Sequence, residues 1–527
     1  MPFNIKSRLN FFTKNLKLSS CLKVEINSLS ALVLIFIVTL STTTCLNSKF
    51  SRDSILLYIL LSFLFAFSYI MSLNHLMKAK SFIFHFFMNN FFLLGFFFKF
   101  SIHKISNGNY REPIGSFDVS NSNSEVAILI VIVVAMIGVI LSQAFSALLL
   151  DFKIKDIAKS YSPKNIPSDL RLISLLLFSI LLVVINLNSN IILFGIEPSI
   201  KLPLGGNAIF YLALTRGIIF IYFYYFLRQF SILNALFGSI IISICSIGVL
   251  SRMVVLTYFS VLAVNLIINY KQDGMKKFAI KSSILFLIFL IFSYVTVLLS
   301  GNLRSIMYAN ANANANANAS TSTSTSTSTS TSTSTSTSTK PEPSSDPINK
   351  MFSLKNNSDL VFVKSEINTY VDLALGRWIG IEGVMAVESY KDKGFALLRD
   401  ALLEKSYDGN SFYTKISNPN SITNNSTRVR STSVPGPVAF FYYSNSLFFV
   451  FAALFFCLTF FSLIEFFIMK HFINYQMAAI FFSSSMAFDF FQFGISPIAF
   501  VKYLSFSLGC IAIFYFLINY TFKRIRV

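Results

Sequence analysis

Long apolar segments separated by short polar ones run through most of the chain. Each apolar run is roughly 20 residues long, as in Val126 to Leu150 and Ser283 to Leu299, which is the length of a helix that crosses the core of a bilayer. Twelve such segments are predicted to span a membrane: 28–47, 54–73, 82–101, 126–150, 172–189, 207–227, 231–250, 254–270, 283–300, 444–468, 474–493 and 503–521. The pattern predicts an all-α polytopic membrane protein with about twelve transmembrane helices.

The distribution of positive charge predicts the orientation of these helices. Lys and Arg remain mainly on the cytoplasmic side of a membrane protein. They gather in the polar segment 1–27 and after alternate spans, for example in 151–171 and 271–281. We therefore expect both ends of the chain in the cytoplasm, with 522–527 as a short C-terminal tail.

One long outer loop, 301–443, is predicted to join two membrane blocks at 28–300 and 444–521. Its residues 309–339 are strict Ala/Asn and Ser/Thr repeats, which cannot bury a core, so we expect a disordered or extended spacer there. Apolar positions at helical spacing predict a helical part at 365–406, made of helices within 365–390 and 393–406.

Composition agrees with this assignment and limits the chemistry. Only 13% of the 527 residues are charged, whereas a soluble domain carries about a quarter. The five Cys and four His are scattered, so we expect no disulfide framework, no metal site and no cofactor. The net charge of +20 is explained by membrane orientation, so nucleic acid is not expected as a partner.

Three arginines are candidates for binding an anion. Arg216 lies near the middle of its predicted span, where a charge must face a cavity or a partner. It either carries chemistry or forms a structural ion pair with Asp489 or Glu465. Arg252 and Arg304 are predicted at the outer surface, where they act as anchors or bind phosphate through the planar guanidinium.

The segment GRWIGIEGVMAVESY contains the only Trp of the chain. Arg377 is a candidate phosphate clamp, Trp378 a sugar-stacking platform and Glu382 a general base. On a helix, Trp378 and Glu382 would share a face, whereas Arg377 and Glu382 would point about 140° apart. The glycines around them indicate close backbone approach to membrane helices or to a ligand. The alternative is a re-entrant helix that only packs.

Two tyrosines, Tyr442 and Tyr443, follow a Pro-Gly-Pro turn at the predicted membrane edge. They are candidates for sugar binding, and the alternative is an aromatic belt at the interface.

This layout and several short segments resemble the bacterial O-antigen or oligosaccharide repeat-unit polymerases, the Wzy-like family. The resemblance covers most of the chain as architecture, and the segments that carry it are NIILFGIEPSIKLPLGGNAIFYLALTRG, GVLSRMVVLTY and LGRWIGIEGVMAV followed by SVPGPVAFFYYSNSLFFVF. The Arg-x10-Gly pattern described for some members is absent from the four arginines considered above.

The resemblance implies a metal-independent glycosyltransferase of the bacterial inner membrane, surrounded by membrane lipids. It would transfer a glycan from undecaprenyl pyrophosphate to a lipid-linked repeat unit, with a chain-length regulator protein as a further partner. Glu382 would accept the proton of the acceptor hydroxyl. Arg377 and three further arginines would hold the pyrophosphate and stabilise it as the leaving group: Arg216, Arg252 and Arg304.

Three other classes remain open. An O-antigen ligase generally relies on a His in its long loop, and this loop has none. A lipid-linked oligosaccharide flippase or other transporter often has internal repeats and short loops, whereas this chain shows no repeat of its spans and has one loop of over a hundred residues. A metal-dependent lipid-sugar glycosyltransferase usually presents acidic residues on its first outer loop, where this chain offers only Asp53.

Overall fold

The computed structural model describes most of the hydrophobic segments. The described residues are 28–48, 50–79, 82–106, 110, 112–150, 169–193, 198–203, 206–225, 231–323, 378–404, 411–418, 434–471, 476–494 and, with single-residue gaps, 497–509. All statements below concern these residues.

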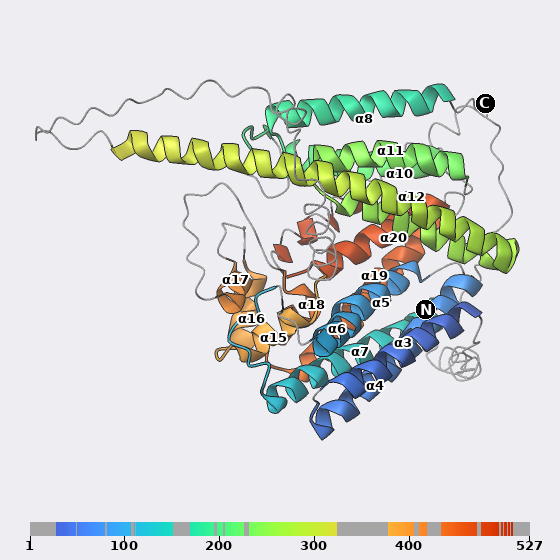
Figure 1. The fold of residues 1–527 in the computed structure, drawn as a ribbon, viewed down its shortest axis with the longest axis vertical. Helices are drawn as coiled ribbons and strands as arrows, with labels where there is room; N and C mark the ends of the chain where they lie inside the picture. The colour runs from blue at the N-terminus through green and yellow to red at the C-terminus, as the bar shows by residue number, and fades with distance from the viewer. Residues whose placement is uncertain are drawn as a thin grey trace, which may run out of the picture.

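Apolar helices form the body of the molecule (Figure 1). Three of them are single helices: α3 (Ser28–Asn47), α4 (Arg52–Ala79) and α7 (Ser122–Leu150). A fourth is one continuous helical rod made of α5 (Ile83–Phe92), η1 (Leu93–Phe98) and α6 (Lys99–Ser106). The next are α8 (Asp169–Ser189), the rod α9 (Gly206–Leu212), η4 (Ala213–Gly217) and α10 (Ile218–Tyr225), then α11 (Ile232–Gly248) and α12 (Met253–Thr323). The last two are α19 (Leu447–His471) and α20 (Gln476–Phe491).

Nine helical stretches of the described residues are long and apolar enough to cross a membrane. α12 supplies two of them, because Gly274 adopts a positive φ of 74° and interrupts the helix, a conformation that glycine tolerates. Two shorter apolar helices, Ile232–Gly248 and Met477–Phe491, overlap further predicted spans. The last predicted span, 503–521, lies largely outside the described residues. The chain is therefore an all-α, multi-pass membrane protein.

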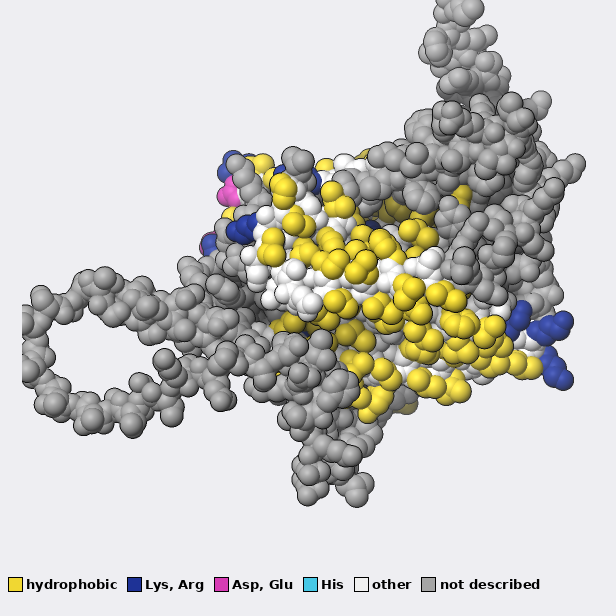
Figure 2. All heavy atoms as spheres, turned by 90° about the horizontal axis from the view of Figure 1, so that it is seen from above, with side chains coloured by type: hydrophobic (Ala, Val, Ile, Leu, Met, Phe, Trp, Pro, Cys, Tyr) yellow, Lys and Arg dark blue, Asp and Glu magenta, His cyan; other side chains and the backbone are white. Residues whose placement is uncertain are grey.

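Large apolar side chains face outward on several of these helices. Leu32 of α3, Leu177 of α8, Phe286 of α12 and Phe467 of α19 are each at least 60% exposed, as expected for side chains that contact lipid. On the face drawn in Figure 2, hydrophobic side chains form a broad band over the described residues, and the Lys and Arg side chains lie mainly towards two ends of this band. Inside, α20 packs against α5 on one side and against α10 and α12 on the other, and so joins the two halves of the bundle.

The dipeptide repeat differs from its predicted form. α12 continues to Thr323, so residues 309–323 are helical and the expectation of disorder is wrong for this part. The remaining repeat residues, 324–339, lie outside the described residues. The preceding apolar helix has already met the cost of nucleation, and the Ala residues, which have the highest helix propensity, offset the lower propensity of the Asn, Ser and Thr residues of this part. Figure 1 shows this end of α12 projecting beyond the bundle.

Four short helices belong to the predicted outer loop: α15 (Ile381–Ser389), α16 (Phe395–Leu402), α17 (Phe412–Ser417) and α18 (Gly436–Tyr442). α16 confirms the helix predicted within 393–406. The helix predicted within 365–390 is present only from Ile381 in the described part, so Trp378 precedes it. Trp378 and Glu382 therefore do not share a helical face, contrary to the prediction.

Candidate functional site

The loop helices pack against one end of the bundle, where α15, α16 and α17 are grouped (Figure 1). α15 contacts α7, α17 and α18, and α18 contacts α7, α19 and α20. Every residue of α18 is buried, as is α15 from Ile381 to Val387. Glu382 is the one charged residue in these two buried stretches, so they pack among the membrane helices instead of standing in water.

Two glycine contacts explain how α15 can approach so closely. A Cβ on Gly380 would lie 2.0 Å from the carbonyl oxygen of Gly95, and one on Gly383 would lie 2.4 Å from that of Pro435. The close backbone approach predicted from the glycines is therefore confirmed. Gly95 lies ten residues before the end of the candidate span Ile83–Ile105, which is about 15 Å along a helix, so the loop segment returns deep into the bundle.

Glu382 forms an ion pair with Lys99 at this point. The two side chains are 2% and 1% exposed, and Lys99 Nζ also donates a hydrogen bond to the Trp378 carbonyl oxygen at 2.8 Å. The Trp378 ring lies 5.9 Å from that of Phe98. The Lys99 ammonium group thus contacts both predicted residues, Glu382 through its carboxylate and Trp378 through its backbone carbonyl.

The local backbone supports this arrangement. Lys99 directly follows the π-helical turn η1, Leu93–Phe98, and π-helical turns occur frequently at functional sites. Burial raises the pKa of the Glu382 carboxyl, and the neighbouring Lys99 ammonium opposes that rise. The pair joins one positive and one negative side chain that solvent barely reaches, and Lys99 Nζ contacts the carboxylate through Oε1.

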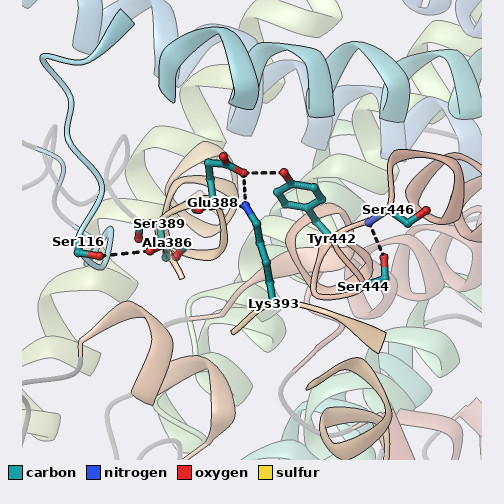
Figure 3. A network of polar contacts seen from close by, with 8 residues as sticks. All are labelled: Ser116, Ala386, Glu388, Ser389, Lys393, Tyr442, Ser444 and Ser446. Atoms are coloured by element: carbon teal, nitrogen blue, oxygen red, sulfur yellow. Dashed lines mark hydrogen bonds and ion pairs between the residues drawn. The ribbon is translucent and has the colours of Figure 1, made fainter. Parts of the chain in front are cut away.

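A second carboxylate of α15 is more accessible (Figure 3). Glu388 Oε2 accepts a hydrogen bond from the Tyr442 hydroxyl at 2.5 Å and pairs with Lys393 Nζ at 2.6 Å. The Lys393 ammonium also lies 5.0 Å from the centre of the Tyr442 ring. The Glu388 and Lys393 side chains are 21% and 14% exposed. Burial, the hydrogen bond to Glu388 and the charge of Glu388 all raise the pKa of the Tyr442 hydroxyl.

Sequence reasoning missed Glu388, Lys393 and Lys99. Lys99 interrupts the apolar run FFLLGFFFKF, and Glu388 follows Glu382 by six residues in the segment already considered. An isolated cation in a predicted span was the available signal for Lys99. No comparable signal marked Lys393, because it stands in an ordinary polar turn.

The predicted ion pair of Arg216 with Asp489 is confirmed. Arg216 Nη2 lies 2.5 Å from Asp489 Oδ1, and the two side chains are 15% and 16% exposed. Arg216 lies in the second π-helical turn, η4, and Asp489 in the last turn of α20. Glu465 has other partners, because its carboxylate accepts the backbone N–H groups of Ile83 at 2.7 Å and Phe84 at 2.9 Å.

The remaining predicted residues occupy different places. The Arg304 guanidinium donates to the carbonyl oxygen of Leu250, so Arg304 and Arg252 gather at the turn between α11 and α12. Tyr443 is 0% exposed and Tyr442 7%, so neither ring belongs to a surface belt. Arg377 lies outside the described residues.

No group of three or more His, Cys, Asp or Glu side chains in the described part of the chain is arranged to hold a metal ion. The chemistry that these residues offer is acid–base exchange at Glu382 or Glu388 and anion binding at the arginines. No protein-family model, curated protein sequence or solved structure matches the chain.

Proposed function

We propose that this membrane protein is a glycosyltransferase that polymerises undecaprenyl-pyrophosphate-linked oligosaccharide repeat units into a surface polysaccharide. The observation that carries the proposal is the return of the loop segment into the bundle. It places Glu382 inside the bundle of apolar helices that face lipid and leaves a second carboxylate, Glu388, more accessible at the end of that bundle. A lipid-linked sugar presents its reactive carbon at such a boundary between lipid and water.

The reaction requires a proton acceptor and a stabilised leaving group. The acceptor sugar hydroxyl loses its proton to a carboxylate and its oxygen forms a bond to the anomeric carbon of the donor glycan. The bond from that carbon to the pyrophosphate breaks, and undecaprenyl pyrophosphate leaves with the electron pair. Arg216, Arg252 and Arg304 are the proposed groups that stabilise its charge, together with Arg377.

Either carboxylate of α15 is a candidate for the proton acceptor. Glu382 was predicted from the sequence, but it is 2% exposed and paired with Lys99. Glu388 is 21% exposed, and its hydrogen bond from Tyr442 and its ion pair with Lys393 fix its orientation. A general base must come within hydrogen-bond reach of its substrate, which favours Glu388 and gives Glu382 a role in holding α15 in place. Tyr442, Tyr443 and Trp378 remain proposed sugar-binding residues.

Deletion of the gene from its host, followed by complementation, tests the activity. Loss of the polysaccharide ladder with retention of a core-plus-one-unit band on a gel supports a polymerase. Loss of all bands that carry glycan would point instead to a flippase or ligase. An unchanged ladder would contradict the proposal for that glycan.

Matched variants then separate the two carboxylates. We expect E388Q to abolish the ladder at an unchanged amount of folded protein, and E382Q to lower the amount of folded protein in the membrane. Full ladder formation by E388Q together with a folded, inactive E382Q would assign the proton acceptor to Glu382. Wild-type ladders from both variants would exclude both carboxylates as the proton acceptor.

A further inference from the structure

The short helix α16 presents an apolar face that the described part of the chain leaves about half exposed. Its residues Leu398 and Ala401 are buried. In contrast, Phe395 is 60% exposed, and the exposed fractions of Leu402 and Leu403 are 40% and 61%. At 3.6 residues per turn, Leu402 lies about 20° to one side of Phe395, and Leu403, the C-cap residue of α16, lies about 80° to the other side. The three side chains therefore form one exposed face.

This face continues the lipid-facing surface of α19. The Phe395 ring packs edge-on against Phe449, with ring centres 5.6 Å apart, and the Gly394 N–H donates to the Tyr443 carbonyl oxygen at 2.7 Å. These contacts hold the start of α16 beside the first turn of α19. The exposed aromatic side chains of α19 begin in that same turn and run along the helix: Phe448, Phe456, Phe460 and Phe467, at 76%, 66%, 54% and 63% exposure.

The charged residues of α16 suit the edge of a bilayer. The Arg399 side chain is 71% exposed and pairs with Asp400 at 3.0 Å. Arg399 lies about 40° from Phe395 around the helix, on the exposed face. A long Arg side chain in that position can keep its stem in apolar surroundings while its charge reaches lipid headgroups. Helices that present Phe and Leu side chains to lipid and carry Arg for the headgroups typically lie in the plane of a membrane interface.

We propose that α16 lies in the membrane interface, with Phe395, Leu402 and Leu403 inserted at the acyl-chain boundary of the adjoining leaflet. The occupant of this face is lipid, because the face is continuous with the lipid-facing stripe of α19. This placement sets Lys393, in the turn just before α16, at headgroup depth, together with its ion-pair partner Glu388 in the last turn of α15. It holds whether or not the chain is a polymerase.

The single Trp of the chain makes a direct test possible. In a W378F background, F395W and D400W each carry one Trp, the first on the exposed apolar face of α16 and the second about 140° away around the helix. Each full-length variant is reconstituted in phosphatidylcholine nanodiscs that contain lipid with a nitroxide near the headgroup end of its acyl chain. Acrylamide, dissolved in the water, is the second quencher.

For F395W we expect blue-shifted emission that the nitroxide lipid quenches more strongly than it quenches D400W. Acrylamide should quench the two variants in the reverse order. Equal acrylamide quenching of both variants, without quenching of F395W by the nitroxide, would place α16 in water and overturn the proposal. Shielding of F395W from both quenchers would also overturn it, because a protein surface would then cover the face.

Discussion

Removal of the Lys99 charge tests the dry ion pair at the base of α15. The variant K99M keeps an apolar stem of similar length and leaves Glu382 without its cation. Both side chains are at most 2% exposed, so water cannot replace the missing charge. Loss of one partner of a buried pair costs about 3–5 kcal/mol of stability.

Protonation of Glu382 sets an upper limit on the part of this cost that comes from its unpaired charge, whereas the lost hydrogen bond from Lys99 to the Trp378 carbonyl adds a part that does not depend on pH. For a carboxyl of ordinary pKa 4.5, holding the proton costs about 1.36 kcal/mol per pH unit above that value. The limit is therefore about 4 kcal/mol at pH 7.5 and about 1.4 kcal/mol at pH 5.5. In K99M the folded-state pKa of Glu382 lies above its unfolded value, so the folded state binds more protons. The stability of the variant therefore falls as the pH rises through the window between the two pKa values.

Denaturant unfolding in detergent micelles at these two pH values measures the effect. We expect K99M to be clearly less stable than the parent protein at pH 7.5 and to recover most of the deficit at pH 5.5. The double variant K99M/E382Q, which removes both charges, should be close to the parent protein at both pH values. An equal deficit of K99M at the two pH values would refute this reasoning, as would a double variant no more stable than K99M.

Three further predictions use the same unfolding assay. G380A places a Cβ 2.0 Å from a backbone oxygen and should lower the stability by about 1–3 kcal/mol or more. Its control G301A, whose Cβ would have nothing within 4 Å, should raise the stability by about 1 kcal/mol. Equal effects of the two variants would contradict the close packing at Gly380. E465A leaves two backbone N–H groups without their acceptor and should lower the stability by about 1–3 kcal/mol, and E465Q should lower it less. An E465A variant as stable as the parent protein would show that the carboxylate does not stabilise the fold. R216M should destabilise the protein more than R216M/D489L, because the single variant leaves the carboxylate of Asp489 unpaired. If the double variant is folded and still forms the polysaccharide ladder on a gel, Arg216 does not belong to the proposed pyrophosphate site.

The membrane helices could be predicted because their signal is local. A helix in lipid must satisfy its own backbone hydrogen bonds and must be about 20 residues long, so runs such as Ser28–Asn47 and Ser122–Leu149 are visible without any knowledge of their neighbours. The partner of Arg216 could be narrowed to two carboxylates because so few charges occur in the apolar segments. The helical form of 309–323 was missed, because the composition of the repeat does not show that a preceding helix can extend into it.

The sequence by itself determined the class of protein, most of its spans and the residue types at the candidate site. Only the tertiary structure decided which of these residues meet. Lys99 and Glu382 are far apart in the chain, and their ion pair depends on a glycine contact between Gly95 and Gly380. Glu388 likewise depends on the packing of α15 against α18 for its hydrogen bond from Tyr442. Hydropathy records only whether a side chain prefers lipid or water, whereas these pairings arise from the close packing of particular helix faces.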